Sequence, residues 1–109
     1  MPTNYKVLGQ SNPAATTATT LYTVPSATQA IVSTITVTNQ TATAGTYRIA
    51  VRVAGAALAA NQYIAYDVSL PGNATDTLTL GVTLGAPDVI TVYASAATFS
   101  FNAFGSELS

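Results

Sequence analysis

The sequence has neither cysteine nor histidine, and it has very few charged residues. Without cysteine, disulfide bonds and thiolate metal sites are excluded. Without histidine, general acid–base catalysis loses the side chain that it uses most often. Aspartate, glutamate, lysine and arginine together make up 6% of the chain, whereas a typical soluble domain has about a quarter. These absences argue against an enzyme and favour a structural or adhesive role.

The few charged residues form no catalytic or binding motif. The four carboxylates are scattered, and Asp76 and Asp88 fall where turns are expected to meet strands, which is ordinary turn chemistry. Neither an Asp-rich calcium loop nor a glycine-rich phosphate loop is present. Three basic residues and a net charge of −1 do not make the positive footprint that nucleic-acid binding requires. We therefore expect no catalytic residue, no cofactor-binding residue, no metal ligand and no nucleic-acid partner.

Signals for membranes and export are also missing. No apolar run approaches the length of about 18 residues that a membrane helix needs, so no membrane partner is expected. Residues 1–6 lack the basic head and apolar run of a signal peptide. Asn39-Gln40-Thr41 matches the N-glycosylation pattern, but a threonine-rich chain produces such matches by chance. We expect a protein that is made in a cytoplasm and carries no export signal of its own.

Apolar side chains recur at every second position through most of the chain, which is typical of half-buried strands. In one run, Ile31, Ile35 and Val37 are expected to share a face, with Val32 on the other. Turn residues such as Pro71-Gly72-Asn73 separate the runs at intervals of about 8–12 residues. We predict an all-β chain, a single small antiparallel β-sandwich of the jelly-roll or immunoglobulin-like type with about seven or eight strands. The predicted strands are Thr20–Val24, Ala30–Thr38, Thr46–Ala54, Gln62–Leu70, Asp76–Leu84, Val89–Ala94 and Thr98–Phe104.

Three segments add detail to this prediction. Residues 10–20 show no period, so residues 1–19 are expected to form an extended lead-in and residues 20–109 the β-sandwich domain. The alanine-rich stretch from Gly55 to Asn61 is too short for a stable helix and fits a strand edge or a loop equally well. Near the C-terminus, Phe99 and Phe101 share a strand face, which indicates a last strand that closes the core. The alternative is an aromatic tail that docks on a neighbouring subunit.

Low charge combined with many strands is a hazard for a free monomer, because weak self-repulsion leaves strand edges open to association. This combination favours a subunit that is covered by copies of itself or by a larger assembly. Arg48 and Arg52 share one strand face, and they either bridge to Asp67 or Asp88 on adjacent strands or contact an acidic patch on a partner subunit. The candidate subunit contacts are Tyr5, Lys6, Arg48, Arg52 and Phe104.

Several segments resemble small virion structural proteins of tailed bacteriophages, including phages of cyanobacteria and marine bacteria. The resemblance spans nearly the whole chain. It implies a particle component that is present in many copies, has no enzymatic residues, and is assembled into the virion in the cytoplasm of the host bacterium. The segments that carry it are 4–10 (NYKVLGQ), 20–25 (TLYTVP), 31–39 (IVSTITVTN), 46–52 (TYRIAVR) and 99–107 (FSFNAFGSE).

The expected function is that of a capsid decoration, or cement, protein that stabilises the head by docking on the major capsid protein. Its other expected partner is itself, in a homo-oligomer for which a trimer is favoured. The first alternative is a component of the tail, the baseplate or the fibre attachment. The second is a host-surface or carbohydrate-binding module, for which Tyr63 and Tyr66 are the only candidate aromatic pair. Strand alternation places these two on opposite faces, so a shared platform is not expected.

Overall fold

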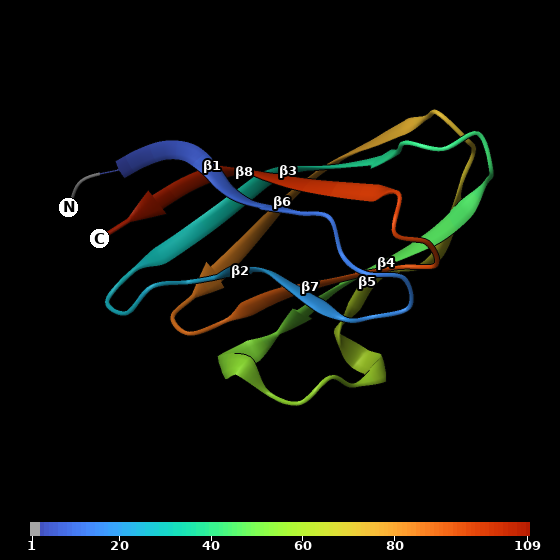
Figure 1. The fold of residues 1–109 in the computed structure, drawn as a ribbon. Helices are drawn as coiled ribbons and strands as arrows, with labels where there is room; N and C mark the ends of the chain where they lie inside the picture. The colour runs from blue at the N-terminus through green and yellow to red at the C-terminus, as the bar shows by residue number, and fades with distance from the viewer. Residues whose placement is uncertain (1–2) are drawn as a thin grey trace.

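The computed structural model describes residues 3–109, which form two antiparallel sheets and their connections (Figure 1). Sheet A has the strand order β1-β8-β3-β6, and sheet B has the order β2-β7-β4-β5. The helical part of the described chain consists of two short 3₁₀ turns, Val53–Gly55 and Ala60–Gln62. The strands are β1 (Thr3–Ser11), β2 (Thr19–Thr23), β3 (Gln29–Asn39), β4 (Gly45–Arg52), β5 (Tyr63–Leu70), β6 (Thr75–Gly85), β7 (Val89–Ala94) and β8 (Phe99–Leu108).

The strand pairing identifies the topology. β1 pairs with β8, β2 with β7, β3 with β6, and β4 with β5, all antiparallel. The first half of the chain therefore pairs with the second half as one long hairpin, and successive pairs belong alternately to sheet A and sheet B. This arrangement is a jelly roll. The predicted all-β sandwich is confirmed, and of the two proposed types the jelly roll is the one found.

Strand β1 corrects the predicted domain boundary. Residues 3–11 are not an extended lead-in but an edge strand of sheet A, hydrogen-bonded to β8 along its length. Residues 1–2 of the expected lead-in lie outside the described residues. The first and last described strands are thus neighbours, and Thr3 is the Cα partner of Leu108. Figure 1 shows the start of β1 and the end of β8 side by side at one end of the sandwich.

The core lies between the two sheets and is made of large aliphatic and aromatic side chains. The ring of Tyr47 in β4 lies with its centroid 6.5 Å from that of Phe99 and 6.1 Å from that of Phe101, both in β8. Phe99 and Phe101 are fully buried, which confirms that the last strand closes the core. Burying each such side chain contributes about 1.5–3 kcal/mol. Other side chains at 0–1% exposure are Val24, Val32, Ile35, Val37, Ile49, Leu70, Ile90 and Val92.

A bulge in β3 changes which residues of this strand face the core. The pairing of β3 with both of its neighbours shifts between Val32 and Thr34, so Ser33 is an extra residue in the β3–β8 ladder. Val32 and Ile35 are both fully buried, whereas Ile31 is 39% exposed. The expectation that Ile31 shares a face with Ile35 is therefore wrong, because an extra residue reverses strand alternation.

Asn39 joins three connections at one end of the sandwich. Its side chain is fully buried, and its Nδ2 donates to the backbone carbonyls of Thr43 at 2.9 Å and Pro71 at 3.4 Å. Its Oδ1 accepts hydrogen bonds from the Thr41 N–H at 3.2 Å and the Thr98 hydroxyl at 3.3 Å. A buried amide whose oxygen and nitrogen are both hydrogen-bonded is not accessible for attachment of a glycan. The match at Asn39-Gln40-Thr41 is therefore not a glycosylation site in the folded protein, and Asn39 has a structural role instead.

Candidate docking surfaces

Two of the five candidate contact residues lie together on the outer face of sheet A. Phe104 of β8 is the Cα partner of Val7 in β1, and Tyr5 lies two residues before Val7 on the same face. In the neighbouring row, Ser106 of β8 pairs with Tyr5 on one side and with Ile31 of β3 on the other. These side chains point away from the core. We call Tyr5, Val7, Ile31 and Phe104 the outer patch.

The outer patch is apolar and open to solvent. The exposed fraction is 85% for Tyr5, 49% for Val7, 39% for Ile31 and 36% for Phe104. On β6, the face continues with the exposed hydroxyl residue Thr83, the Cα partner of Ile31. None of these side chains carries a charge. Neighbouring apolar side chains exposed on one sheet face are typical of an interaction surface.

Lys6, the third candidate, faces the opposite side of β1. Its Nζ lies 2.8 Å from Glu107 Oε1, and the hydroxyl of Tyr22 in β2 donates to the other carboxylate oxygen. Glu107 is only 8% exposed. The hydrogen bond from Lys6, and then that from Tyr22, holds the pKa of Glu107 below its usual range. Burial, reinforced by the carboxylate, raises the pKa of the Tyr22 hydroxyl. Lys6 thus takes part in an internal link between the two sheets.

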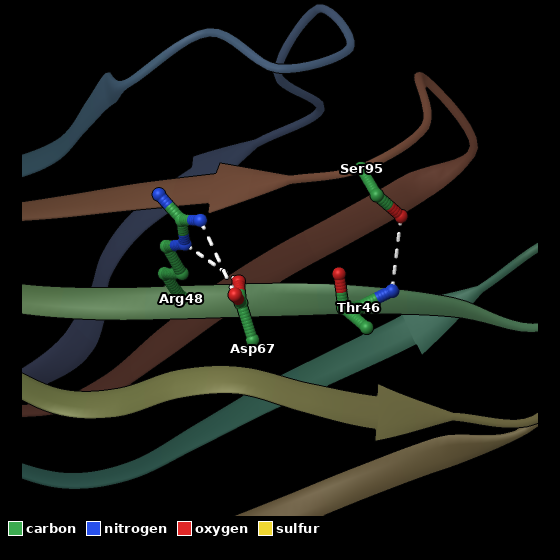
Figure 2. A network of polar contacts seen from close by, with 4 residues as sticks. All are labelled: Thr46, Arg48, Asp67 and Ser95. Atoms are coloured by element: carbon green, nitrogen blue, oxygen red, sulfur yellow. Dashed lines mark hydrogen bonds and ion pairs between the residues drawn. The ribbon is translucent and has the colours of Figure 1, made fainter.

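Arg48, the fourth candidate, is bound on sheet B by a carboxylate and two aromatic rings. Its Nε donates to Asp67 Oδ1 at 2.6 Å and its Nη2 to Asp67 Oδ2 at 3.3 Å (Figure 2). The guanidinium carbon lies 4.3 Å from the ring centroids of both Tyr66 and Tyr93. The hydrogen bond to Asp67 raises the pKa of the guanidinium above its usual value. Figure 2 also shows Ser95, whose hydroxyl accepts the Thr46 N–H at 2.9 Å.

Arg52, the fifth candidate, closes the connection between β4 and β5. Its Nε donates to the carbonyl of Ala56 at 2.7 Å, and its Nη2 donates to the carbonyl of Gly55 at 3.0 Å. Asp88 accepts the Ala54 N–H at 2.8 Å, so the start of this connection is bound both by the Arg52 guanidinium and by the Asp88 carboxylate. Neither predicted bridge, to Asp67 or to Asp88, is formed by Arg52. The Gly55–Asn61 stretch is a loop between the two 3₁₀ turns.

Tyr63 and Tyr66 form the aromatic pair that alternation had placed apart. Their ring centroids are 4.9 Å apart and their planes meet at 81°. In β5, Val68 pairs with Tyr47 and Ala65 with Ile49, so two residues, Tyr66 and Asp67, lie opposite the single residue Arg48. Asp67 has a φ of 50° at this bulge. The expectation that the tyrosines face opposite ways is wrong because a second irregularity lies between them. Ile49 pairs with Ala65 and Ala50 with Tyr63, so Ile64 is an extra residue that reverses the alternation.

The two tyrosines form one wall of a surface hollow of about 560 Å³. The other walls come from the loop that Arg52 closes. Tyr66 is 56% exposed and Leu58 is 42% exposed, so the hollow offers apolar surface to solvent. We call this site the tyrosine hollow, and its lining residues are Leu58, Ala59, Ala60, Tyr63 and Tyr66.

All four edge strands contain irregular pairing. In sheet A, the ladder shifts at Leu8 in β1 and around Gly81 in β6. In sheet B, it shifts at Leu21 in β2 and at Asp67 in β5. Bulges twist an edge and hinder the approach of a further strand. The strand edges are therefore poor docking sites, and the sheet faces are better candidates. This differs from the sequence-based expectation that the strand edges are open to association.

The carboxylates have structural partners. Asp67 binds Arg48, Glu107 binds Lys6, and Asp76 accepts the hydroxyl of Tyr47 at 2.9 Å. Asp88 accepts the N–H groups of Ala54 and Gly85. Within residues 3–109, no three Asp or Glu side chains gather into a group that could hold a metal ion.

In the same part of the chain, no helix is long and apolar enough to cross a membrane.

Comparison of the chain with protein-family models, with curated proteins and with solved structures found no match.

Proposed function

We propose that this chain is a virion structural protein of a tailed bacteriophage, and that it decorates the capsid by docking on the major capsid protein. The observation that carries this proposal is the outer patch, where Tyr5, Val7, Ile31 and Phe104 expose apolar surface on one face of sheet A. Burial of this face against another protein would stabilise the contact in proportion to the apolar area removed from water.

Two further features support a role in an assembly. The chain carries only seven charged residues, and each of its carboxylates is bound to a group of the same chain. A surface with so little free charge opposes close packing of many copies only weakly. The jelly roll is also a fold of viral capsid domains, which is an analogy at the level of the fold alone.

The proposal is tested with particles of the encoding phage that lack this gene product. Purified protein is mixed with the particles, and the bound copies are counted by sedimentation and quantitative mass spectrometry. We expect wild-type protein to bind intact heads. The double variant Tyr5→Ser/Phe104→Ser should bind at least about tenfold more weakly, because it removes two apolar anchors from the patch. Val53→Ser is the matched control, since Val53 is 67% exposed but lies in the β4–β5 connection.

Three results would contradict capsid docking through the outer patch. The first is equal binding of the wild type and the double variant. The second is equal weakening by Val53→Ser. The third is binding to isolated tails or baseplates but not to heads, which would favour a tail, baseplate or fibre-attachment component.

A further inference from the structure

We propose that the tyrosine hollow is a binding site for a neutral saccharide, with a pyranose ring stacked against the exposed tyrosine surface. This proposal does not depend on capsid docking, because the hollow is on sheet B and its connecting loop, whereas the outer patch is on sheet A. The inference rests on how the aromatic rings are held, on the size of the hollow and on its charge.

The ring of Tyr66 is exposed, yet it is held in place by several contacts. The Arg48 guanidinium lies 4.3 Å from its centroid, and the same guanidinium is fixed by two hydrogen bonds to Asp67 and by the ring of Tyr93. Tyr63 meets Tyr66 edge to face. An aromatic side chain that is fixed before a ligand arrives loses little conformational entropy on binding.

The backbone beneath Tyr66 is also unusual. Asp67 adopts a φ of 50°, in the left-handed region, within a β-strand. This conformation costs free energy for a residue other than glycine, and strained residues of this kind cluster at functional sites. Here the strain has a clear structural result, because the bulge turns Asp67 to the same side as Tyr66 and points it at Arg48, whose guanidinium lies over the Tyr66 ring.

The size of the hollow suits a small ligand, since binding sites for small molecules range over about 300–1,000 Å³. Its volume of about 560 Å³ lies within this range. The loop that forms its other wall is fixed by Arg52 and by Gln62, whose Nε2 donates to the Ala57 carbonyl at 2.9 Å. Gln62 Oε1 accepts the Ala59 N–H at 2.8 Å. The loop wall is thus held by side-chain hydrogen bonds, and the tyrosine wall is held by the contacts of Tyr66 with Arg48 and Tyr63.

The charge of the hollow selects the class of ligand. None of its lining residues is charged. The only cationic side chains of the chain are Lys6, Arg48 and Arg52, and each is bound to acceptors of the chain itself. Within residues 3–109, every cationic side chain is thus already paired, which disfavours a phosphate, a sulfate or an acidic sugar as the ligand. The hollow suits a neutral ligand that combines an apolar face with hydrogen-bonding groups.

A pyranose ring has this combination. Its C–H hydrogens carry a small positive charge and are attracted to the negative face of an aromatic ring. Its hydroxyl groups can exchange hydrogen bonds with the phenol hydroxyls of Tyr63 and Tyr66, which donate and accept. A purely apolar ligand would use the rings but leave the hydroxyls without partners.

The test uses the full chain and four neutral hexasaccharides as probes: α-1,4-linked glucose, β-1,4-linked glucose, β-1,4-linked N-acetylglucosamine and α-linked mannose. Binding is measured by saturation-transfer NMR and titration calorimetry. We expect at least one probe to bind, and Tyr66→Ala to weaken that binding about tenfold through loss of the stacked ring. Tyr66→Phe should keep most of the affinity, because it keeps the ring.

Tyr5→Ala is the matched control, since Tyr5 is the most exposed tyrosine and lies outside the hollow. It should leave saccharide affinity unchanged. Thermal unfolding of each variant shows whether the fold is intact, and Tyr63→Ala provides a second variant of the hollow if Tyr66→Ala does not fold. The proposal is overturned if none of the four probes binds, or if binding is the same in the folded Tyr66 or Tyr63 alanine variant. It is also overturned if a probe binds the protein but does not displace an apolar dye that occupies the hollow, because the saccharide would then bind elsewhere.

Discussion

Glu107 joins three strands through a single carboxylate. It belongs to β8, one of its oxygens lies 2.8 Å from Lys6 of β1, and the other accepts the hydroxyl of Tyr22 in β2. The link crosses from sheet A to sheet B at the end of the sandwich where the chain begins and ends. Because the side chain is nearly buried, removing a partner would leave a poorly solvated charge, which is more costly than losing an exposed ion pair.

The lowered pKa of Glu107 predicts a specific dependence of stability on pH. Its contribution is complete above the unfolded-state pKa of about 4.3, and it is lost as the pH falls through the lower pKa of the folded state. The amide of Glu107→Gln does not titrate in this range. The variant should therefore be less stable than the wild type near pH 7, and the difference should shrink as the pH falls below the unfolded-state pKa and through the lower pKa of the folded state.

Urea unfolding of both proteins across this pH range measures the difference. The two proteins differ only at residue 107, so every other pH-dependent contribution cancels in the comparison. A difference in unfolding free energy that stays constant from neutral to acidic pH would show that Glu107 does not titrate with a lowered pKa in the folded state.

At the scale of strands, the alternation of the sequence predicts β2 to β7 with ends that agree within two residues, and it predicts β8 as far as Phe104. It misses β1 for a physical reason. In β1 the apolar side chains of Tyr5 and Val7 face solvent, while the charged Lys6 faces Glu107. A strand with this reversed pattern gives no core-facing signal in the sequence.

The candidate sites were harder to predict than the strands. The outer patch joins Tyr5 and Ile31, which are far apart in the sequence and become neighbours only through the two ladders of β8. The tyrosine hollow depends on bulges in β5. The left-handed residue there is Asp67, an aspartate among regular strand residues, so neither glycine nor proline marks the position.

Gly105 of β8 provides a prediction about strand spacing. A Cβ at this position would overlap the backbone carbonyl of Ile31 in β3, next to the bulge at Ser33. The backbone of a central strand cannot easily move away, so Gly105→Ala should destabilise the protein by about 1–3 kcal/mol. Gly85→Ala is the matched control, because a Cβ there meets no atom within 4 Å.

Chemical denaturation of the two alanine variants checks this expectation. Gly85→Ala should have an unfolding free energy close to that of the wild type, within about 0.5 kcal/mol. Equal stability of Gly105→Ala and Gly85→Ala would mean that β3 and β8 are not as closely spaced as the structure shows.

For the molecule as a whole, the surface favours association through a face over association through an edge. The net charge is −1, so repulsion between copies is weak. All four edge strands are bulged, and Asp76 on β6 points inward to Tyr47. Inward-pointing charges and bulges are both known protections of sheet edges.

When no capsid is present, the outer patch is free to contact another copy, so we expect the purified protein to self-associate with rising concentration. Light scattering coupled to size-exclusion chromatography gives the mass. Tyr5→Ser/Phe104→Ser should shift the equilibrium to monomer, whereas Thr20→Lys, which adds a charge to the exposed edge strand β2 of sheet B, should not. A monodisperse monomer at high concentration would contradict self-association. Dissociation by Thr20→Lys alone would show that copies meet at the β2 edge of sheet B.

The pairing of β1 with β8 also decides how the molecule would respond to a mechanical load. Because Thr3 lies opposite Leu108, a pull on the two ends acts across the ladder and not along it. The hydrogen bonds between antiparallel strands are perpendicular to the strands. Such a pull would therefore break the hydrogen bonds between β1 and β8 one after another, beginning at Thr3 and Leu108. A load applied to the face of sheet A would instead be shared among β1, β8 and β3. A subunit that must withstand tension is therefore better anchored by its face than by its ends.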